Sequence, residues 1–144
     1  MRILDFLSST FTGKLFSNRE LAQVRGEISF PEAIAAHAAW KSHLIEAVTG
    51  RSGTIPHCDE VGSDTRCTLG QWIHGAGEKR YGDLSSFVEL RTQHARFHDI
   101  ACDIVELSRA KKMGEARRLM DGEFQKTSTD IILRLKRLSG LFGN

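Results

Sequence analysis

Apolar side chains recur every three or four residues through most of this chain, which is the spacing of one face of an α-helix. The first such stretch, from Met1 to Phe16, carries Ile3, Leu4, Leu7, Phe11 and Leu15. It predicts an amphipathic leader, and we assign residues 1–29 to this leader. Such a segment either packs on its own bundle or contacts a partner or a membrane surface, and the pattern leaves both open.

Three long helices and one short helical segment are predicted after the leader. The first helix runs from Pro31 to Gly50, with proline in its first turn and glycine at its end. Glycine, proline and polar residues make 51–64 a connection, and Cys67 to Gly75 a short helical segment. The longest helix opens at Asp83 and keeps its period to Ser108. The final helix follows at once.

Each of the two later helices has an expected inward face. In the longest helix this face comprises Leu84, Phe87, Val88, His94, His98, Ala101 and Val105. In the final helix it comprises Ala116, Met120, Phe124, Thr127, Ile131, Leu135 and Leu138. The sequence therefore predicts an all-α protein. Residues 30–138 form an antiparallel four-helix bundle with a short extra helical segment that carries Cys67, and 139–144 form a loose tail.

Composition and charge narrow the function classes. The formal net charge of +2 is too small, and the basic residues too evenly mixed with acidic ones, to favour a nucleic-acid partner. No apolar run approaches the roughly 18 residues of a membrane span. The first residues also lack the uninterrupted apolar stretch of a secretory signal, so we expect a cytoplasmic protein. Three cysteines are then better suited to metal or redox chemistry than to a disulfide framework.

Histidines on the inward faces are the candidate metal ligands. His94 and His98 are four residues apart, so both imidazoles lie on one side of the helix and can reach one ion. Buried histidines that only bond to carbonyls remain the alternative. His37 lies on the apolar face of the first helix, where a lone imidazole would need a partner. Cys67 lies near a predicted helix start and beside Arg66, which favours the thiolate that zinc prefers.

Three short motifs carry a resemblance to a known family. They are H-A-A-W at His37–Trp40, C-T-L-G-Q-W at Cys67–Trp72 and H-A-R-F-H at His94–His98. They resemble the H-x-x-W, C-x-L-G-x-W and H-x-x-x-H signature of the chemoreceptor zinc-binding (CZB) domain, in the same order. The resemblance spans about Phe30 to Leu138. It implies a bacterial, cytoplasmic helical bundle that holds Zn²⁺ with His37, Cys67, His94 and His98.

The resemblance also implies a function. Family members are attached to chemoreceptors or diguanylate cyclases, and zinc or oxidants such as hypochlorous acid alter the output. This chain has no room for either domain, so it resembles stand-alone members. We expect a non-enzymatic regulatory module that acts on a protein partner in chemotaxis or cyclic-di-GMP signalling, works as a homodimer and uses Cys67 as its redox switch. A structural zinc-stapled dimerisation bundle and a zinc hydrolase using the three histidines are the alternatives.

The remaining candidates have structural interpretations. Trp40 and Trp72 are expected to pack around the site and shield it. His43 lies about 120° round the helix from His37 and is expected at the surface. Cys58 has an auxiliary metal or redox role as its less favoured interpretation, and Cys102 is either a fallback ligand or a small buried residue.

Overall fold

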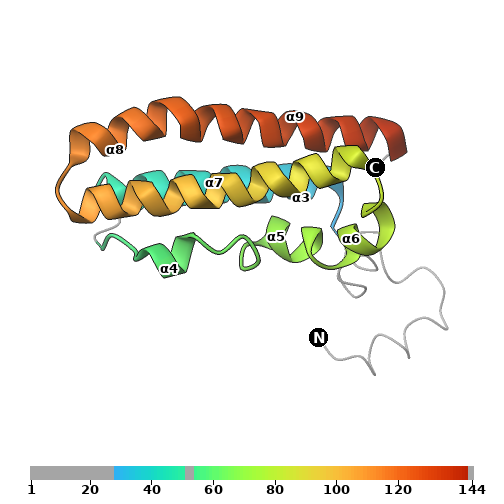
Figure 1. The fold of residues 1–144 in the computed structure, drawn as a ribbon, viewed down its shortest axis with the longest axis horizontal. Helices are drawn as coiled ribbons and strands as arrows, with labels where there is room; N and C mark the ends of the chain where they lie inside the picture. Colours follow the sequence, from blue (N-terminus) through green and yellow to red (C-terminus); the bar gives the residue numbers. More distant parts are fainter. Residues whose placement is uncertain (1–27, 51–53, 143–144) are drawn as a thin grey trace, which may run out of the picture.

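The computed structural model describes residues 28–50 and 54–142, and the helices account for most of them (Figure 1). Their bounds are Phe30–Val48 (α3), Cys58–Val61 (α4), Thr68–Ile73 (α5), Ala76–Tyr81 (α6), Ser85–Arg109 (α7), Met113–Leu119 (α8), a π-helical stretch Met120–Phe124 (η1) and Gln125–Phe142 (α9). The described residues contain no strand, which confirms the all-α prediction.

The long helices lie along one another, and the chain reverses direction at each connection. Figure 1 shows α3 and α7 running one way and α9 the other, with α4, α5 and α6 forming the return path from α3 to α7. This return path, which we call the broken arm, consists of three short helices, whereas a four-helix bundle would have one continuous helix there. Five glycines between residues 62 and 82 interrupt it, because glycine weakens a helix interior. The predicted connection 51–64 thus contains α4, and α6 was not predicted.

Local sequence explains the bounds of α3. Ser29 caps the first turn by accepting a hydrogen bond from the N–H of Glu32, whose side chain in turn accepts from the N–H of Ser29. Pro31 occupies the first turn, as predicted. After the last turn Gly50 has φ of 85°, a conformation that glycine adopts without strain.

The inward face of α7 differs from the prediction at its start. Leu84 and Val88 are 36% and 37% exposed, so their assignment to the buried face was wrong. Leu84 precedes the first helical residue, Ser85, and Val88 is about 100° round the helix from the fully buried Phe87. Beyond that point the predicted face is buried, and Leu90, Phe97, Ile100 and Ile104 extend it.

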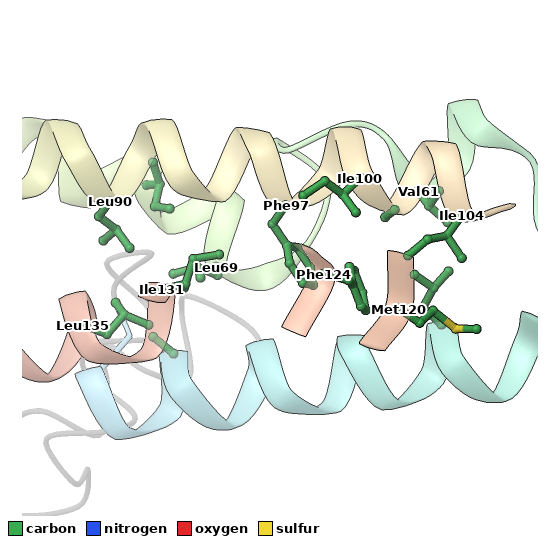
Figure 2. Packing of buried hydrophobic residues seen from close by; sticks show 14 of the residues in the cluster. Val61, Leu69, Leu90, Phe97, Ile100, Ile104, Met120, Phe124, Ile131 and Leu135 are labelled. Carbon is green, nitrogen blue, oxygen red and sulfur yellow. The ribbon is translucent and has the colours of Figure 1, made fainter. Parts of the chain in front are cut away.

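The elements α8, η1 and α9 follow one another without a break and form the last helical rod, which packs against the core on the side opposite α4, α5 and α6 (Figure 1). Every residue of its predicted inward face is buried. Phe124 stacks on Phe97 of α7 with ring centroids 4.5 Å apart, and Figure 2 shows this pair between the two helices. The rod continues to Phe142, so the tail that we expected to be loose from Ser139 is helical that far.

The two remaining expectations concern the N-terminal leader and membrane-spanning helices. Residues 1–27 of the expected leader lie outside the described residues. Among the residues that are described, no helix combines the length and apolar character needed to cross a membrane.

Candidate metal centre

Three side-chain donors meet at the interface of α5 and α7. The Nε2 atoms of His94 and His98 are 3.2 Å apart, and the Sγ of Cys67 is 3.3 Å from the first and 3.5 Å from the second. Tetrahedral zinc, with bonds of about 2.0–2.1 Å to nitrogen and about 2.3 Å to sulfur, separates its donors by about 3.3–3.6 Å. The three donors therefore fit three corners of a zinc tetrahedron.

The local sequence places these donors. α7 presents His94 and His98 on consecutive turns of its buried face, where they are 0% and 1% exposed. Cys67 is the N-cap of α5, and its sulfur accepts a hydrogen bond of 3.2 Å from the N–H of Gly70. A Cβ at Gly70 would lie 1.9 Å from the carbonyl oxygen of Asp64 and 3.2 Å from Cε1 of His94. The glycine of C-T-L-G-Q-W is thus required for the close approach of loop, helix and ligand.

Burial keeps the two imidazoles neutral. Desolvation, followed by repulsion from His98, lowers the pKa of His94 to about 2, and desolvation also lowers the pKa of His98. His98 donates from Nδ1 to the carbonyl of Val61 at 2.7 Å, so its Nε2 carries the lone pair that faces the cluster. The buried Nδ1 of His94 has no hydrogen-bond partner among the described residues. A neutral imidazole whose Nε2 lone pair faces the cluster, as in His98, is what a metal requires.

The environment of Cys67 differs from the sequence expectation. Burial raises the pKa of its thiol, and the N–H of Gly70 only partly opposes that effect. Arg66, which we expected to favour the thiolate, is exposed and donates to the carbonyl of Asp59 at 3.0 Å. Without metal the thiol is therefore the favoured form, and a bound cation would supply the charge that stabilises the thiolate.

His37 is close to this cluster but outside it. Among the described residues, the donors that lie near enough to share one ion with Cys67 are His94 and His98, and His37 is not one of them. The buried His37 has its Nε2 2.9 Å from Oγ of Ser128 on α9. Desolvation, followed by repulsion from His98, lowers the pKa of His37 to about 4, so it too is neutral.

Aromatic side chains and an open cavity surround the donors. Trp40 packs edge-on against His98, with ring centroids 4.5 Å apart. Trp72 is buried further along the core, against Phe30 and Phe87. A cavity of about 250 Å³ is lined by His37, Trp40, His43, Cys67 and His98 among others, so it reaches the cluster from the surface.

The other two cysteines are bonded to each other. Cys58 at the start of α4 and Cys102 on α7 are joined by a disulfide, with Cα atoms 4.5 Å apart. The expectation that the three cysteines are better suited to metal or redox chemistry than to a disulfide was therefore wrong for this pair. Cys102 is half-buried and is not in the donor group of Cys67, His94 and His98. The sequence showed only that Cys102 follows His98 by one helical turn, and this spacing does not reveal a partner 44 residues away. Cys67 is free.

Comparison with known proteins gives one family. Residues 37–105 match the chemoreceptor zinc-binding domain, which confirms the resemblance carried by the three motifs. The matched segment includes His37 as well as Cys67, His94 and His98. No curated protein and no solved structure matches the chain significantly.

Proposed function

Residues 37–105 belong to the chemoreceptor zinc-binding domain family, and on that basis we propose that the chain is a zinc-responsive regulatory module. The observation that carries the proposal is the convergence of Cys67, His94 and His98 at the donor spacing of tetrahedral zinc. These residues come from α5 and α7, so a shared ion would tie the broken arm to the longest helix. Occupancy would therefore change how firmly that arm is held.

His37 is our candidate for the fourth ligand. It is buried, neutral and lines the same cavity as Cys67 and His98. To reach the cluster its ring would exchange the Ser128 hydroxyl for the metal. This exchange would connect α3, and through Ser128 also α9, to the state of the site, which gives zinc binding a route to the long helices.

Zinc content measured on the purified protein tests this site. We expect one zinc per chain, and a loss of affinity of about 10²-fold or more when His37, His94 or His98 is replaced by alanine, since each donor contributes a share of the binding free energy. His43→Ala is the matched control, because His43 is an exposed histidine on the same helix as His37. Full zinc occupancy in all three ligand variants would refute the site.

Whether His37 binds zinc also distinguishes a regulatory site from a catalytic one. Catalytic zinc keeps one position open for water, whereas four protein ligands close the site. The donor cluster includes no carboxylate that could act as general base, and Asp64, which influences the pKa values of Cys67 and His98, is paired with His74 at 3.0 Å. If His37→Ala bound zinc as tightly as the wild type, the fourth position would be open and the hydrolase alternative would gain support.

Affinity distinguishes a sensor from a structural staple. We expect zinc to exchange with a competing chelator while the helices remain folded. Zinc that leaves only on unfolding, followed by circular dichroism in the same titration, would identify a staple.

Oxidation of Cys67 is the second proposed input. The cavity gives small oxidants access to its half-buried sulfur, and a sulfenic acid is a poorer zinc donor than a thiolate. Substoichiometric hypochlorous acid should therefore modify Cys67 and release zinc, and Cys67→Ser should weaken zinc binding at unchanged helix content. Peptide mass spectrometry identifies the oxidised residue, and zinc retained after Cys67 is oxidised would refute this input.

The output would pass through other chains. We propose a homodimer that acts on a signalling partner of the chemoreceptor or diguanylate cyclase type, as the family assignment suggests. Light scattering at micromolar concentration with zinc present tests the dimer, and a monomeric mass would refute it.

A further inference from the structure

A second sulfur centre lies one turn along α7 from the metal donors. The disulfide between Cys58 and Cys102 joins α4 to α7 across 44 residues of sequence. Both residues are half-buried, so reagents in solution can reach them, in contrast to the buried His94 and His98. Neither sulfur belongs to the donor cluster formed by Cys67 and the two histidines.

The helix that this disulfide holds is short and carries a contact to the metal site. α4 has only four residues, Cys58–Val61, too few to be stable alone. Its last residue, Val61, accepts the hydrogen bond from Nδ1 of His98 and buries its side chain in the core. Figure 2 shows Val61 on the same side of the core as Ile100 and Ile104 of α7. The disulfide therefore fixes one end of the helix whose other end orients His98.

From this arrangement we propose that Cys58 and Cys102 are a reversible dithiol–disulfide pair whose oxidation tightens zinc binding through the Val61–His98 hydrogen bond. The inference rests on the proposed zinc site for its second half only. This pair is a redox site separate from Cys67, and its oxidation has the opposite effect on zinc affinity. Oxidation of Cys67 removes a zinc donor, whereas oxidation of the pair holds in place the Val61 carbonyl that orients the donor His98.

The reaction needs a disulfide or another two-electron thiol oxidant. With a low-molecular-weight disulfide, one cysteine thiolate attacks a sulfur of the reagent, forms a mixed disulfide and releases one thiol. The second cysteine thiolate then attacks the cysteine sulfur of the mixed disulfide and releases the other reagent thiol. Two protein thiols are oxidised, one external disulfide is reduced to two thiols, and the two protein protons end on those thiols.

The coupling follows from how a histidine ligand is oriented. The Val61 carbonyl holds the proton on Nδ1 of His98 and fixes its ring, and loss of such an outer partner typically costs a metal site about 10- to 100-fold in affinity. Reduction frees Cys58 from Cys102 but leaves the apolar contact of Val61 in place, so we expect the lower end of this range. By reciprocity, zinc must stabilise the disulfide by the same factor.

The test is a redox titration of the full chain in graded mixtures of reduced and oxidised glutathione, once without zinc and once with it. Differential alkylation and peptide mass spectrometry report the state of each cysteine. We expect Cys58 and Cys102 to oxidise together in both series. We expect zinc to shift the midpoint by the equivalent of about tenfold, or about 30 mV, toward the disulfide. If both residues alkylate fully at every ratio, the redox pair is refuted.

Zinc affinity supplies the second readout. Competition with a chromogenic chelator should show about tenfold weaker binding after reduction of the pair with a phosphine, while alkylation confirms that Cys67 is unchanged. Cys58→Ser and Cys102→Ser should each bind zinc as the reduced wild type does, and neither should form an intramolecular disulfide at any glutathione ratio. Equal affinities of the two redox states, or more than one zinc per reduced chain, would refute the coupling. A protein that bound no zinc would refute the proposed function and the coupling, and the alkylation result would still decide whether the pair exists.

Discussion

The donor cluster of Cys67, His94 and His98 and the disulfide between Cys58 and Cys102 both involve α7, and they differ in burial more than in position. His94, His98 and Cys102 follow one another at intervals of four residues, and the broken arm, from α4 to α6, runs antiparallel to α7 (Figure 1). Cys67 of that arm meets the two histidines, and Cys58 meets Cys102. The same geometry, one sulfur from the arm facing donors on one helix, has thus produced two centres.

Burial decides what each centre can do. Around His94 and His98 water is excluded, so protons are disfavoured and neutral nitrogen lone pairs remain available for a cation. Around Cys58 and Cys102 the sulfurs are half-exposed, so they can exchange with thiols and disulfides. Cys67 combines both conditions, since it belongs to the buried cluster and borders an open cavity. One face of α7 can therefore bind metal through His94 and His98 and carry thiol chemistry one turn further on, at Cys102.

The largest expected difference is the response to acid, which should destabilise the buried histidines but leave the Cys58–Cys102 pair unchanged. In the metal-free protein the pKa values of His37 and His94 are about 4 and about 2, below the value near 6.5 expected in the unfolded chain. Their contribution to stability is therefore complete above pH 6.5 and is lost as the pH falls. At pH 5 each histidine should have lost about 2 kcal/mol of unfolding free energy, or about 4 kcal/mol for the pair.

Urea unfolding of the zinc-free protein at pH 7 and pH 5 measures this loss. In His94→Leu the loss should be smaller by about 2 kcal/mol, because one of the three buried imidazoles has been removed. The state of the Cys58–Cys102 pair, read by alkylation at both pH values, should not change. A stability that is constant between pH 7 and pH 5 would contradict the neutral, buried histidine cluster.

Much of this architecture could be predicted because it depends on local signals. The apolar period located the long helices, Ser29, Pro31 and Gly50 marked the ends of α3, and all seven inward residues of the last rod are buried. The pair of histidines was visible because two residues one turn apart share a helix face. Cys67 was a candidate from its place near a helix start, the motifs supported it, and the structure places it beside both histidines.

The features that were missed depend on how distant segments meet. Cys58 and Cys102 are 44 residues apart, and they face each other only because the broken arm runs back along α7. Arg66 is next to Cys67 in sequence, but its side chain turns to the carbonyl of Asp59. The position of His37 depends in the same way on a hydroxyl of α9, which no spacing in the sequence reveals.

The close packing of the buried cluster predicts a strong effect at Gly70. In Gly70→Ala the new methyl group would collide with the Asp64 carbonyl and press on His94, so the loop or the helix must shift. We expect a loss of about 1–3 kcal/mol in unfolding free energy, together with weaker zinc binding. Gly140→Ala is the control, because a methyl group there meets no atom within 4 Å and favours the helix. Equal stability of the Gly70 variant and the wild type would contradict the packing that positions Cys67.

The smallest effect should come from Ser128, whose hydroxyl is the partner of His37. In Ser128→Ala the metal-free protein keeps a buried imidazole nitrogen with its partner removed, which should cost about 1 kcal/mol of unfolding free energy. If His37 turns to zinc when the site is loaded, the hydroxyl is no longer its partner, and the cost should nearly vanish in the zinc-bound protein. Ser108→Ala is the matched control, because this buried serine donates to the carbonyl of Ile104 within its own helix and its cost should not depend on zinc. Denaturant unfolding of both variants with and without zinc provides the four values. A cost at Ser128 that is the same in both states would place His37 permanently on α9 and leave the buried cluster with three protein ligands.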